Sequence, residues 1–297
     1  MHSEIVEIPD LKKEPIPQTV WQKLVENHQV EVGLMIDDYL VNRSRNIKQP
    51  VMDFLFEYYP FRASWLKRWS PGIEVSLTFD DSSNLPFLKD WKTKQNVAYL
   101  DPTTIPEKRI KSFEWILQLM KNIEDRRPSF GCYGMHEWAM VYKSEDIRHN
   151  QVPMRMEARE LAEFVESRAL VCTHFDAFRF FTPDAVPLNK NQLSRETFAE
   201  MEQPGCIHSN MDLYKWAFKG FPWISSDLVF AAFKLACAAR EIDMKASPYD
   251  LREYGLEAIK IETESGRKEY LEAQQSIYEK GIPVRERLIE EYRKILA

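Results

Sequence analysis

Apolar residues recur at helical spacing through most of the chain, and this periodicity restricts the fold more than any other feature. Between Gln18 and Asn42, for example, Trp21, Val25 and Tyr39 belong to an apolar set that returns every three to four positions, as on one face of an α-helix. Only nine of the 297 residues are glycine, a low number for a Rossmann-type or β-rich protein. The sequence therefore predicts a mainly α-helical fold.

Further helices are expected wherever the same spacing returns. These segments are 51–59, 106–125, 135–143, 156–169, 194–201, 207–219, 225–244 and 264–296, with Ser194 as the N-cap of the fifth. Weak alternation at 73–79 and 96–100 predicts short strands, and 257–263 is expected to form another. We therefore expect a flexible arm at residues 1–17 and, at residues 18–297, a single large α-rich domain of about ten helices with a small β element.

Charge and composition narrow the class of partner. The net charge is -6 and no run of more than two basic residues occurs, so a general attraction to nucleic acid is not expected. The most apolar stretch, 227–239, is too short to span a bilayer and is interrupted by Lys234. The N-terminus lacks the pattern of a signal peptide, and four cysteines without a C-x-x-C pair predict reduced thiols in a cytoplasmic protein. The P-loop and G-x-G-x-x-G motifs are absent, so no nucleotide cofactor is expected. The zinc-binding motif H-E-x-x-H is absent as well.

Three of the six histidines have an acidic residue within four positions, in an apolar or aromatic setting. The pairs are His136–Glu137, His174–Asp176 and His208–Asp212. On a helix His208 and Asp212 project from one face, and in an extended segment His174 and Asp176 point the same way. Because buried polar groups cost free energy unless something satisfies them, the recurring pairs predict a shared polar site.

Imidazole and carboxylate are the ligand types of zinc, iron and manganese sites. We therefore predict a divalent metal ion (Fe, Zn or Mn) at this site. Its predicted ligands are His136, His174, His208 and Asp212. Glu137 and Asp176 are the predicted catalytic acid or base. The alternative is that each pair is a structural hydrogen-bonded pair with no ligand.

Several neighbouring residues have two interpretations. Cys132, Cys172 and Cys206 precede the three histidines by four, two and two positions, and they either complete a zinc site or pack as small apolar residues. Arg179 either binds an anionic substrate group or pairs with Asp176, three residues back.

The aromatic-rich stretch 54–69 either lines a pocket for a flat ligand or packs in the core. Asp53, immediately before it, is a further candidate for a buried acid. Around the turn at Pro248, three charged residues either form structural ion pairs or have a functional role: Arg240, Asp243 and Asp250.

Five segments spread over residues 50–265 resemble a bacterial family commonly labelled 3-methyladenine DNA glycosylase. They read FLFEYYPFR, GCYGMHEWAMVY, THFDAFRFFTPDAVPLN, EQPGCIHSNMDLYKWA and REIDMKASPYDL. The family label implies an aromatic pocket that stacks a flipped methylated purine, and a carboxylate that activates water or stabilises the sugar cation. Glu137 beside Trp138, or Asp176 beside Phe175, would be that carboxylate. The label also implies a basic groove for DNA.

Three functions follow as hypotheses. The first is a soluble, metal-dependent enzyme, a hydrolase or oxygenase, acting on a small organic or nucleobase-like substrate. The second is a DNA repair N-glycosylase that removes alkylated purines. The third is a non-enzymatic binding or scaffold protein, in which the buried His–acid pairs are structural. No membrane partner is expected.

Overall fold

The computed structural model describes residues 14–82, 85–86, 90–144 and 152–297. These residues form ten α-helices and a small antiparallel sheet, which confirms the predicted mainly α fold with a small β element. The helices are α1 (Gln18–Ser44), α2 (Pro50–Glu57), α3 (Glu107–Glu124), α4 (Met135–Ala139), α5 (Ala158–Glu166), α6 (Phe175–Phe178), α7 (Phe198–Met201), α8 (Ile207–Gly220), α9 (Ser226–Lys245) and α10 (Glu264–Leu296).

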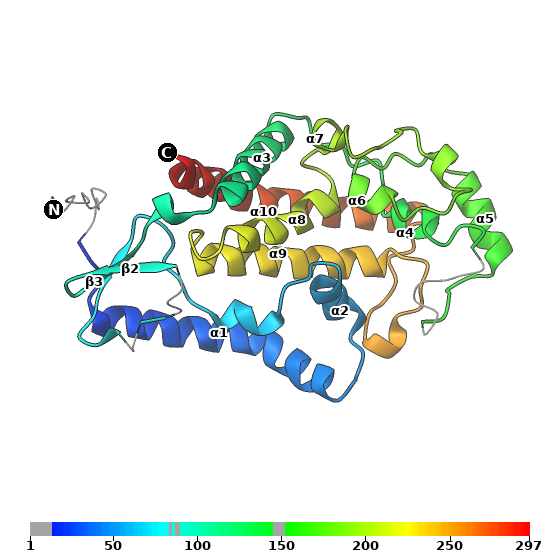
Figure 1. Ribbon diagram of the computed structural model, residues 1–297. Helices are drawn as coiled ribbons and strands as arrows, with labels where there is room; N and C mark the ends of the chain where they lie inside the picture. Colours follow the sequence, from blue (N-terminus) through cyan, green and yellow to red (C-terminus); the bar gives the residue numbers. More distant parts are fainter. Residues whose placement is uncertain (1–13, 83–84, 87–89, 145–151) are drawn as a thin grey trace.

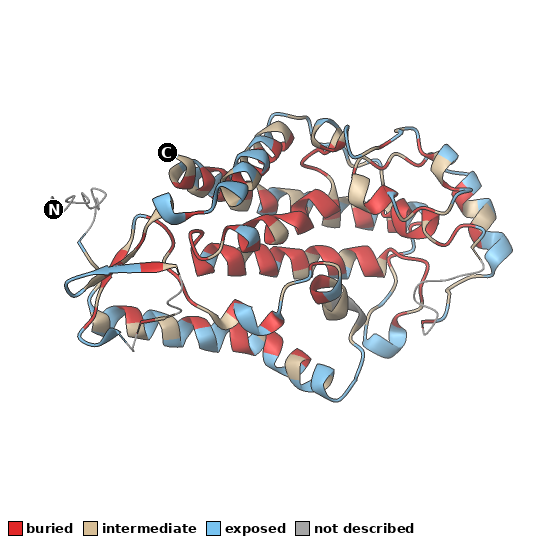
Figure 2. Cartoon of the chain, viewed as in Figure 1, coloured by how far each residue is buried: buried red, intermediate tan, exposed pale blue. Residues whose placement is uncertain are grey.

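Helices α8 and α9 form the centre of the molecule (Figure 1). Helix α10 packs against both of them and against α3, while α2 packs against α9 from the side where α1 lies. Nearly every turn of α8 and α9 is buried (Figure 2), because both helices carry apolar or paired polar side chains around most of their circumference. Polar side chains that these two helices carry must therefore find partners inside the protein.

Buried apolar side chains form two clusters. The larger includes Ile36, Phe113 and Phe233 from α1, α3 and α9. The smaller includes Trp138 of α4 and Val165 of α5. Phe175 of α6 and Ile242 of α9 pack against both clusters. The boundary between the two clusters therefore lies where α4, α6, α8 and α9 approach one another.

The sheet lies at the end of the molecule away from α4 and α5 (Figure 1). Strands β1 (Ser76–Thr78), β2 (Trp91–Lys94) and β3 (Val97–Leu100) pair in the order β1-β3-β2, with Ser76 opposite Tyr99. Of the predicted arm, residues 1–13 lie outside the described residues. Ile16 exchanges backbone hydrogen bonds with Ser76 (2.8 Å) and Thr78 (2.9 Å), so this part of the arm extends the edge of the sheet.

Two elements of the sequence prediction differ from the structure. The strand expected at 257–263 is wrong, because this described segment forms no ladder; Ile259 and Ile261 are instead buried in the smaller apolar cluster without a neighbouring strand. The helix expected from Ser194 begins only at Phe198. The hydroxyls of Ser194 and Thr197 accept from each other's backbone amide (3.3 and 3.0 Å) and hold a turn in place of the first helical residues.

The segment around His174 also differs from expectation. Residues 171–177 are not extended throughout, because His174 is the N-cap of α6 and its Nδ1 accepts the amide hydrogen of Ala177 (3.2 Å). Asp176 consequently lies in the first turn of a helix. His174 and Asp176 therefore contact different groups, although a short polar link connects them.

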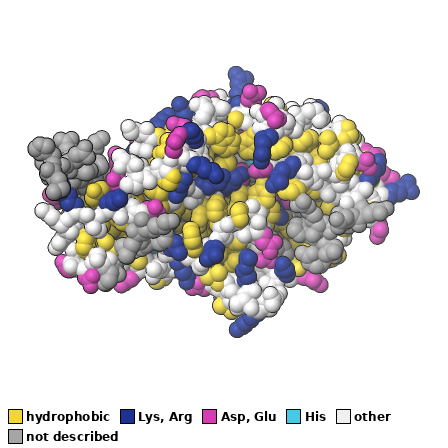
Figure 3. All heavy atoms as spheres, viewed as in Figure 1, with side chains coloured by type: hydrophobic (Ala, Val, Ile, Leu, Met, Phe, Trp, Pro, Cys, Tyr) yellow, Lys and Arg dark blue, Asp and Glu magenta, His cyan; other side chains and the backbone are white. Residues whose placement is uncertain are grey.

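The surface in Figure 3 mixes both signs of charge. Lys and Arg side chains lie singly or in small groups among acidic and apolar side chains on this face. A nucleic-acid backbone is usually bound along a continuous basic band, which this face does not present. Within the described part of the chain, none of the helices combines the length and hydropathy needed to cross a bilayer.

Candidate functional site

The three predicted histidine segments converge in space. His136 comes from the first turn of α4, His174 caps α6 and His208 lies in the first turn of α8. The His208 ring is central, with ring centroids 4.4 Å from His136 and 5.1 Å from His174. All three side chains are buried. The structure therefore brings together residues that are more than 70 positions apart along the chain.

On one side of His208 lies a charge-balanced polar network, which we call the Arg240 cluster (His136, Glu137, Arg240 and Asp243). Only Nε of its guanidinium is buried without a hydrogen-bond partner among the described residues of this cluster. The Nε2 of His136 lies 2.7 Å from Oδ1 of Asp243. The Arg240 guanidinium donates to Oδ2 of Asp243 (2.7 Å) and to Oε1 of Glu137 (2.7 Å). Burial disfavours the charged ring of His136, but the Asp243 carboxylate outweighs it and holds the pKa of His136 well above its usual value. The two cations thus balance the two carboxylates.

On the other side of His208 lies the Lys215 cluster (His174, Glu202, Asp212 and Lys215). The Nε2 of His174 is 3.2 Å from Oε1 of Glu202 and 3.5 Å from Oδ2 of Asp212. All three side chains are buried, yet Nε2 of His174 and Oε1 of Glu202 have no partner with hydrogen-bond geometry. Buried polar atoms in native proteins almost always have a partner, so this pair of atoms needs an explanation.

The outer oxygens of both carboxylates in the Lys215 cluster are fixed by hydroxyl groups. Tyr59 donates to Oδ1 of Asp212 (2.5 Å), and Ser209 donates to Oε2 of Glu202 (2.9 Å). Burial raises the pKa of Glu202 to about 7 against the opposing charge of His174. The two carboxylates are therefore oriented with their inner oxygens toward His174.

Lys215 connects this cluster with the protein surface. Its ammonium group lies 3.0 Å from Oδ2 of Asp212 and 3.1 Å from Oδ2 of Asp176. Asp176 in turn pairs with the half-exposed Arg179 (3.1 Å), as one of the two interpretations of Arg179 predicted. Because Lys215 contacts two carboxylates and neither of them is Glu202, no cation of the cluster other than His174 lies beside Glu202.

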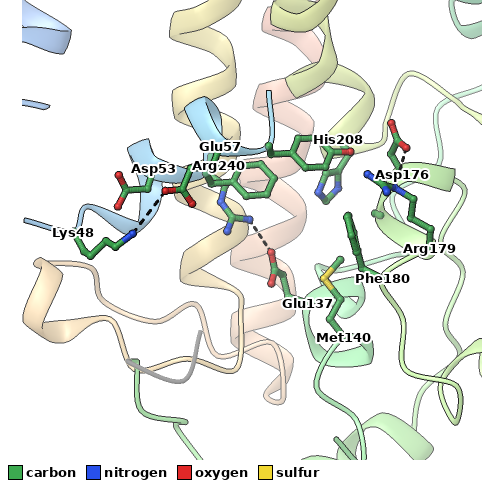
Figure 4. A pocket seen from close by; sticks show the side chains of 13 residues that line it. Lys48, Asp53, Glu57, Glu137, Met140, Asp176, Arg179, Phe180, His208 and Arg240 are labelled. Carbon is green, nitrogen blue, oxygen red and sulfur yellow. Dashed lines mark hydrogen bonds and ion pairs between the residues drawn. The ribbon is translucent and has the colours of Figure 1, made fainter. Parts of the chain in front are cut away.

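A pocket of about 560 Å³ opens beside the clusters. Its wall includes Glu137, Asp176, His208 and Arg240, together with aromatic rings from α2 and the residues after α6. Lys48, Asp53 and Glu57 lie at one end and Asp176 and Arg179 at the other, with His208 between them (Figure 4). The predicted catalytic residues Glu137 and Asp176 and the predicted ligand His208 therefore share one pocket.

His208 differs from the other two histidines in its electrostatics. Burial, followed by the charge of His136, lowers the pKa of His208 well below its usual value. Neither of its ring nitrogens makes a hydrogen bond within the described residues, and Oδ2 of Asp243 is 3.9 Å from its Nε2. His208 therefore presents a neutral imidazole at the inner end of the pocket.

The aromatic-rich stretch serves both of the roles considered for it. Phe54 and Tyr58 are stacked with ring centroids 5.0 Å apart and line the pocket. Leu55, Phe56 and Tyr59 are buried in the larger apolar cluster. The alternation follows from the turn of α2, which directs successive side chains toward different surroundings.

The structure divides the predicted ligands between two groups. Two sets of three buried side chains offer ligand atoms within 4.8 Å of one another and could hold a metal ion. They are His136, His208 and Asp243, and His174, Glu202 and Asp212. Asp212 thus joins His174 rather than His208, although the i, i+4 spacing on α8 had paired it with His208.

Sequence reasoning missed Glu202, Lys215 and Tyr59 as members of the site. Glu202 follows the short helix α7 in a segment, EQPGC, that has no apolar periodicity to suggest burial. Arg240 and Asp243 do form an ion pair, as one of the two interpretations predicted. Asp250 pairs instead with the exposed Arg252.

Comparison with known proteins adds no further constraint. No family model, curated protein or solved structure matches the chain.

Proposed function

We propose that this protein is an enzyme that acts on a small organic molecule in the pocket, and that it carries a divalent metal ion on His174, Glu202 and Asp212. The observation that carries the proposal is the buried face-to-face arrangement of Nε2 of His174 and Oε1 of Glu202, 3.2 Å apart and without hydrogen-bond partners. An imidazole nitrogen and two carboxylate oxygens are a ligand set used for zinc, iron and manganese.

The hydroxyl contacts support this choice of ligands. Tyr59 and Ser209 hold the outer oxygens of Asp212 and Glu202, which leaves the inner oxygens to face His174. Hydrogen bonds of this kind orient metal ligands in known sites. The metal ion would also compensate the buried charge of Glu202, to which Lys215 makes no hydrogen bond.

The other metal-capable group is less suited to an ion. Both oxygens of Asp243 are already engaged, one by His136 and one by the Arg240 guanidinium. A metal ion there would displace a hydrogen bond at 2.7 Å and lie beside a permanent positive charge. Asp212 is likewise engaged by Tyr59 and Lys215, but its group differs because Nε2 of His174 and Oε1 of Glu202 have no hydrogen-bond partner. We therefore assign the Arg240 cluster a structural role and do not include His136 among the ligands of the metal ion on His174, Glu202 and Asp212.

Binding through Nε2 has one local consequence at His174. The ring proton moves to Nδ1, so the contact that Nδ1 accepts from the Ala177 amide is lost. That amide keeps a second acceptor, the carbonyl oxygen of His174 at 3.2 Å. At the start of α6, the Ala177 amide would therefore lose one of its two acceptors and keep the other.

In the pocket, His208 is the proposed proton acceptor. Its ring is neutral and has no hydrogen bond to another described residue, so a lone pair is available to a substrate. Asp176 is linked through Lys215 to Asp212, one of the proposed metal ligands. Glu137 is held by Arg240 and orients the wall of the pocket.

The shape and charge of the pocket indicate the substrate class. The stacked faces of Phe54 and Tyr58 favour a flat molecule, and Lys48 and Arg179 offer cations near its two ends. A planar heterocycle with polar substituents, such as a nucleobase-like compound, fits these features.

The test is elemental analysis of tag-free protein purified without added metal. We expect Zn, Fe or Mn in the wild type, and we expect Glu202→Gln and His174→Gln each to lose about one equivalent of it. Glu200→Gln is the matched control, because Glu200 is exposed and lies two residues away. A folded wild type without metal, even after reconstitution, would overturn the metal assignment and leave a proton shared between His174 and Glu202.

A DNA glycosylase remains the second candidate, favoured by the stacked aromatic pair and the carboxylates in one pocket. A flipped methylated purine would stack there. This candidate predicts release of free methylated base from alkylated DNA and binding that weakens steeply with salt. If neither is observed, the small-molecule substrate stands.

A further inference from the structure

A second group of metal-ligand side chains lies behind the histidines. Three of the four cysteines, Cys132, Cys172 and Cys206, line a small cavity of about 10 Å³ together with His136 and His208. This volume corresponds to one water-sized occupant. The three thiols come from three segments that are far apart in sequence.

His136 presents its second nitrogen to this cavity. Its Nε2 is bound to Asp243, and its Nδ1 lies 3.6 Å from Sγ of Cys132. A carboxylate on one imidazole nitrogen commonly fixes the ring so that the other nitrogen binds a metal. The Asp243–His136 bond thus makes Nδ1 available on the cysteine side, which is the side away from the Arg240 guanidinium.

The cavity wall contains polar side chains beside the apolar Val171 and Ile207. Ser129, Thr173, Gln203 and Gln274 line it along with the cysteines. Gln274 is 1% exposed, and its Oε1 has no hydrogen-bond partner, although its Nε2 donates to the carbonyl of Gly205 (2.7 Å). A polar wall with an unpartnered buried oxygen indicates an occupant that is itself polar or charged.

We propose that this cavity is a zinc site formed by the thiolates of Cys132, Cys172 and Cys206 and by Nδ1 of His136. Three thiolates and one imidazole are a common tetrahedral ligand set for zinc, and soft thiolate ligands favour zinc over harder cations such as Mg²⁺ or Ca²⁺. The site shares no ligand with the His174, Glu202 and Asp212 group, so it goes beyond the proposed function.

Binding balances as a ligand exchange. Zn²⁺ would lose coordinated water, each thiol that binds would release one proton to solvent, and the protonated His136 ring would release its Nδ1 proton while Nε2–H still donates to Asp243; no electron is transferred. Among the described residues, ligand atoms within 4.8 Å of one another are found in the two His/carboxylate sets and not among these thiols, so zinc binding would require the thiols to move inward. Cys132 is partly exposed in the turn before α4 and is the ligand best placed to move.

The structural consequence is a cross-link between distant segments. The ion would join the turn before α4, the strand-like segment before α6 and the residue that precedes α8. These are the elements that position His136, His174 and His208. The zinc site would therefore hold the three-histidine arrangement together from behind.

The test uses Co²⁺ as a spectroscopic substitute for zinc in the full-length protein, after treatment with a chelator under reducing conditions. We expect thiolate-to-cobalt charge-transfer absorption that Zn²⁺ abolishes by displacement. Cys132→Ser should weaken this absorption by on the order of one third or more, because one of three thiolates is removed. Cys237→Ser is the matched control, since Cys237 lies outside the cavity on α9.

Either of two results would overturn the proposal: folded wild type without charge-transfer absorption, or Cys132→Ser with the wild-type spectrum. Circular dichroism establishes that each protein is folded. Glu202→Gln separates this site from the proposed function, because it should retain the thiolate absorption. If Glu202→Gln loses metal and keeps the thiolate absorption, the result concerns the His174, Glu202 and Asp212 site and not the cysteine site.

Discussion

The Arg240 cluster and the Lys215 cluster contain the same kinds of groups in different pairings. Each has one histidine, two carboxylates and one basic side chain, and each adjoins His208. Arg240 bridges both carboxylates of its cluster, because a planar guanidinium offers several donors. Lys215 contacts Asp212 but directs its second contact to Asp176, outside the cluster.

This difference leaves one carboxylate, Glu202, without a basic neighbour other than His174. The Arg240 cluster is closed, because its carboxylates are matched by a guanidinium and a protonated imidazole. The Lys215 cluster remains open to a further cation. The same residue types thus form a structural cluster on one side of His208 and, in our proposal, a metal site on the other.

The largest expected effect is that of removing the cation from the closed cluster. Arg240→Met leaves Glu137 and Asp243 buried without a guanidinium, and we expect a loss of about 3–5 kcal/mol in the free energy of unfolding. Urea denaturation measures this loss. Arg159→Met is the control, because Arg159 pairs with Glu163 on the surface and such pairs contribute little. A variant as stable as wild type would mean that the cluster is not closed by Arg240.

The second prediction compares the same substitution in the two clusters, with metal removed by a chelator. Glu137→Gln should cost about 1–3 kcal/mol, because it weakens a charged hydrogen bond to Arg240. Glu202→Gln should leave stability unchanged or raise it by about 1 kcal/mol, since a neutral amide replaces a buried carboxylate that has no lysine or arginine partner and faces only His174. The Ser209 hydroxyl can still donate to the amide oxygen.

Thermal and urea denaturation of both variants distinguish the outcomes. Opposite signs would support the contrast between a closed and an open cluster. Equal losses would contradict it and would mean that Glu202 is as well paired in the folded protein as Glu137.

Sequence periodicity was sufficient for the architecture because burial repeats along a helix. The apolar set in α1 and the long runs in α9 and α10 predicted helices whose bounds agree to within a few residues. The strand at 257–263 failed because two alternating isoleucines can be buried without a partner strand. Alternation reports burial on one side, whereas a strand also requires a neighbour for its backbone.

Residues of the candidate site could be predicted only where the adjacent residues in the sequence made them unusual. His136, His174 and His208 stand out in apolar or aromatic surroundings, and they do meet. Asp212 has a distant partner, Tyr59 from before the sheet, and such a contact leaves no periodic signal in the sequence. Its other partner, Lys215, lies one turn along α8, and its i, i+3 spacing is a signal that the sequence did offer.

The smallest predicted effect concerns His28, which serves as a reference for a buried histidine without a carboxylate partner. Its Nε2 bonds to the carbonyl of Leu66 (2.8 Å), and burial lowers the pKa of the ring below 6.5. His28 therefore binds a proton more readily in the unfolded chain than in the folded protein. The stability that neutral His28 contributes is present above about pH 6.5 and declines as the pH falls toward the pKa of the folded protein. His28→Gln retains a donor for Leu66 but cannot titrate. We expect its free energy of unfolding to fall less steeply than that of wild type between about pH 7 and pH 5, and identical slopes would show that His28 does not contribute to the acid sensitivity of the fold.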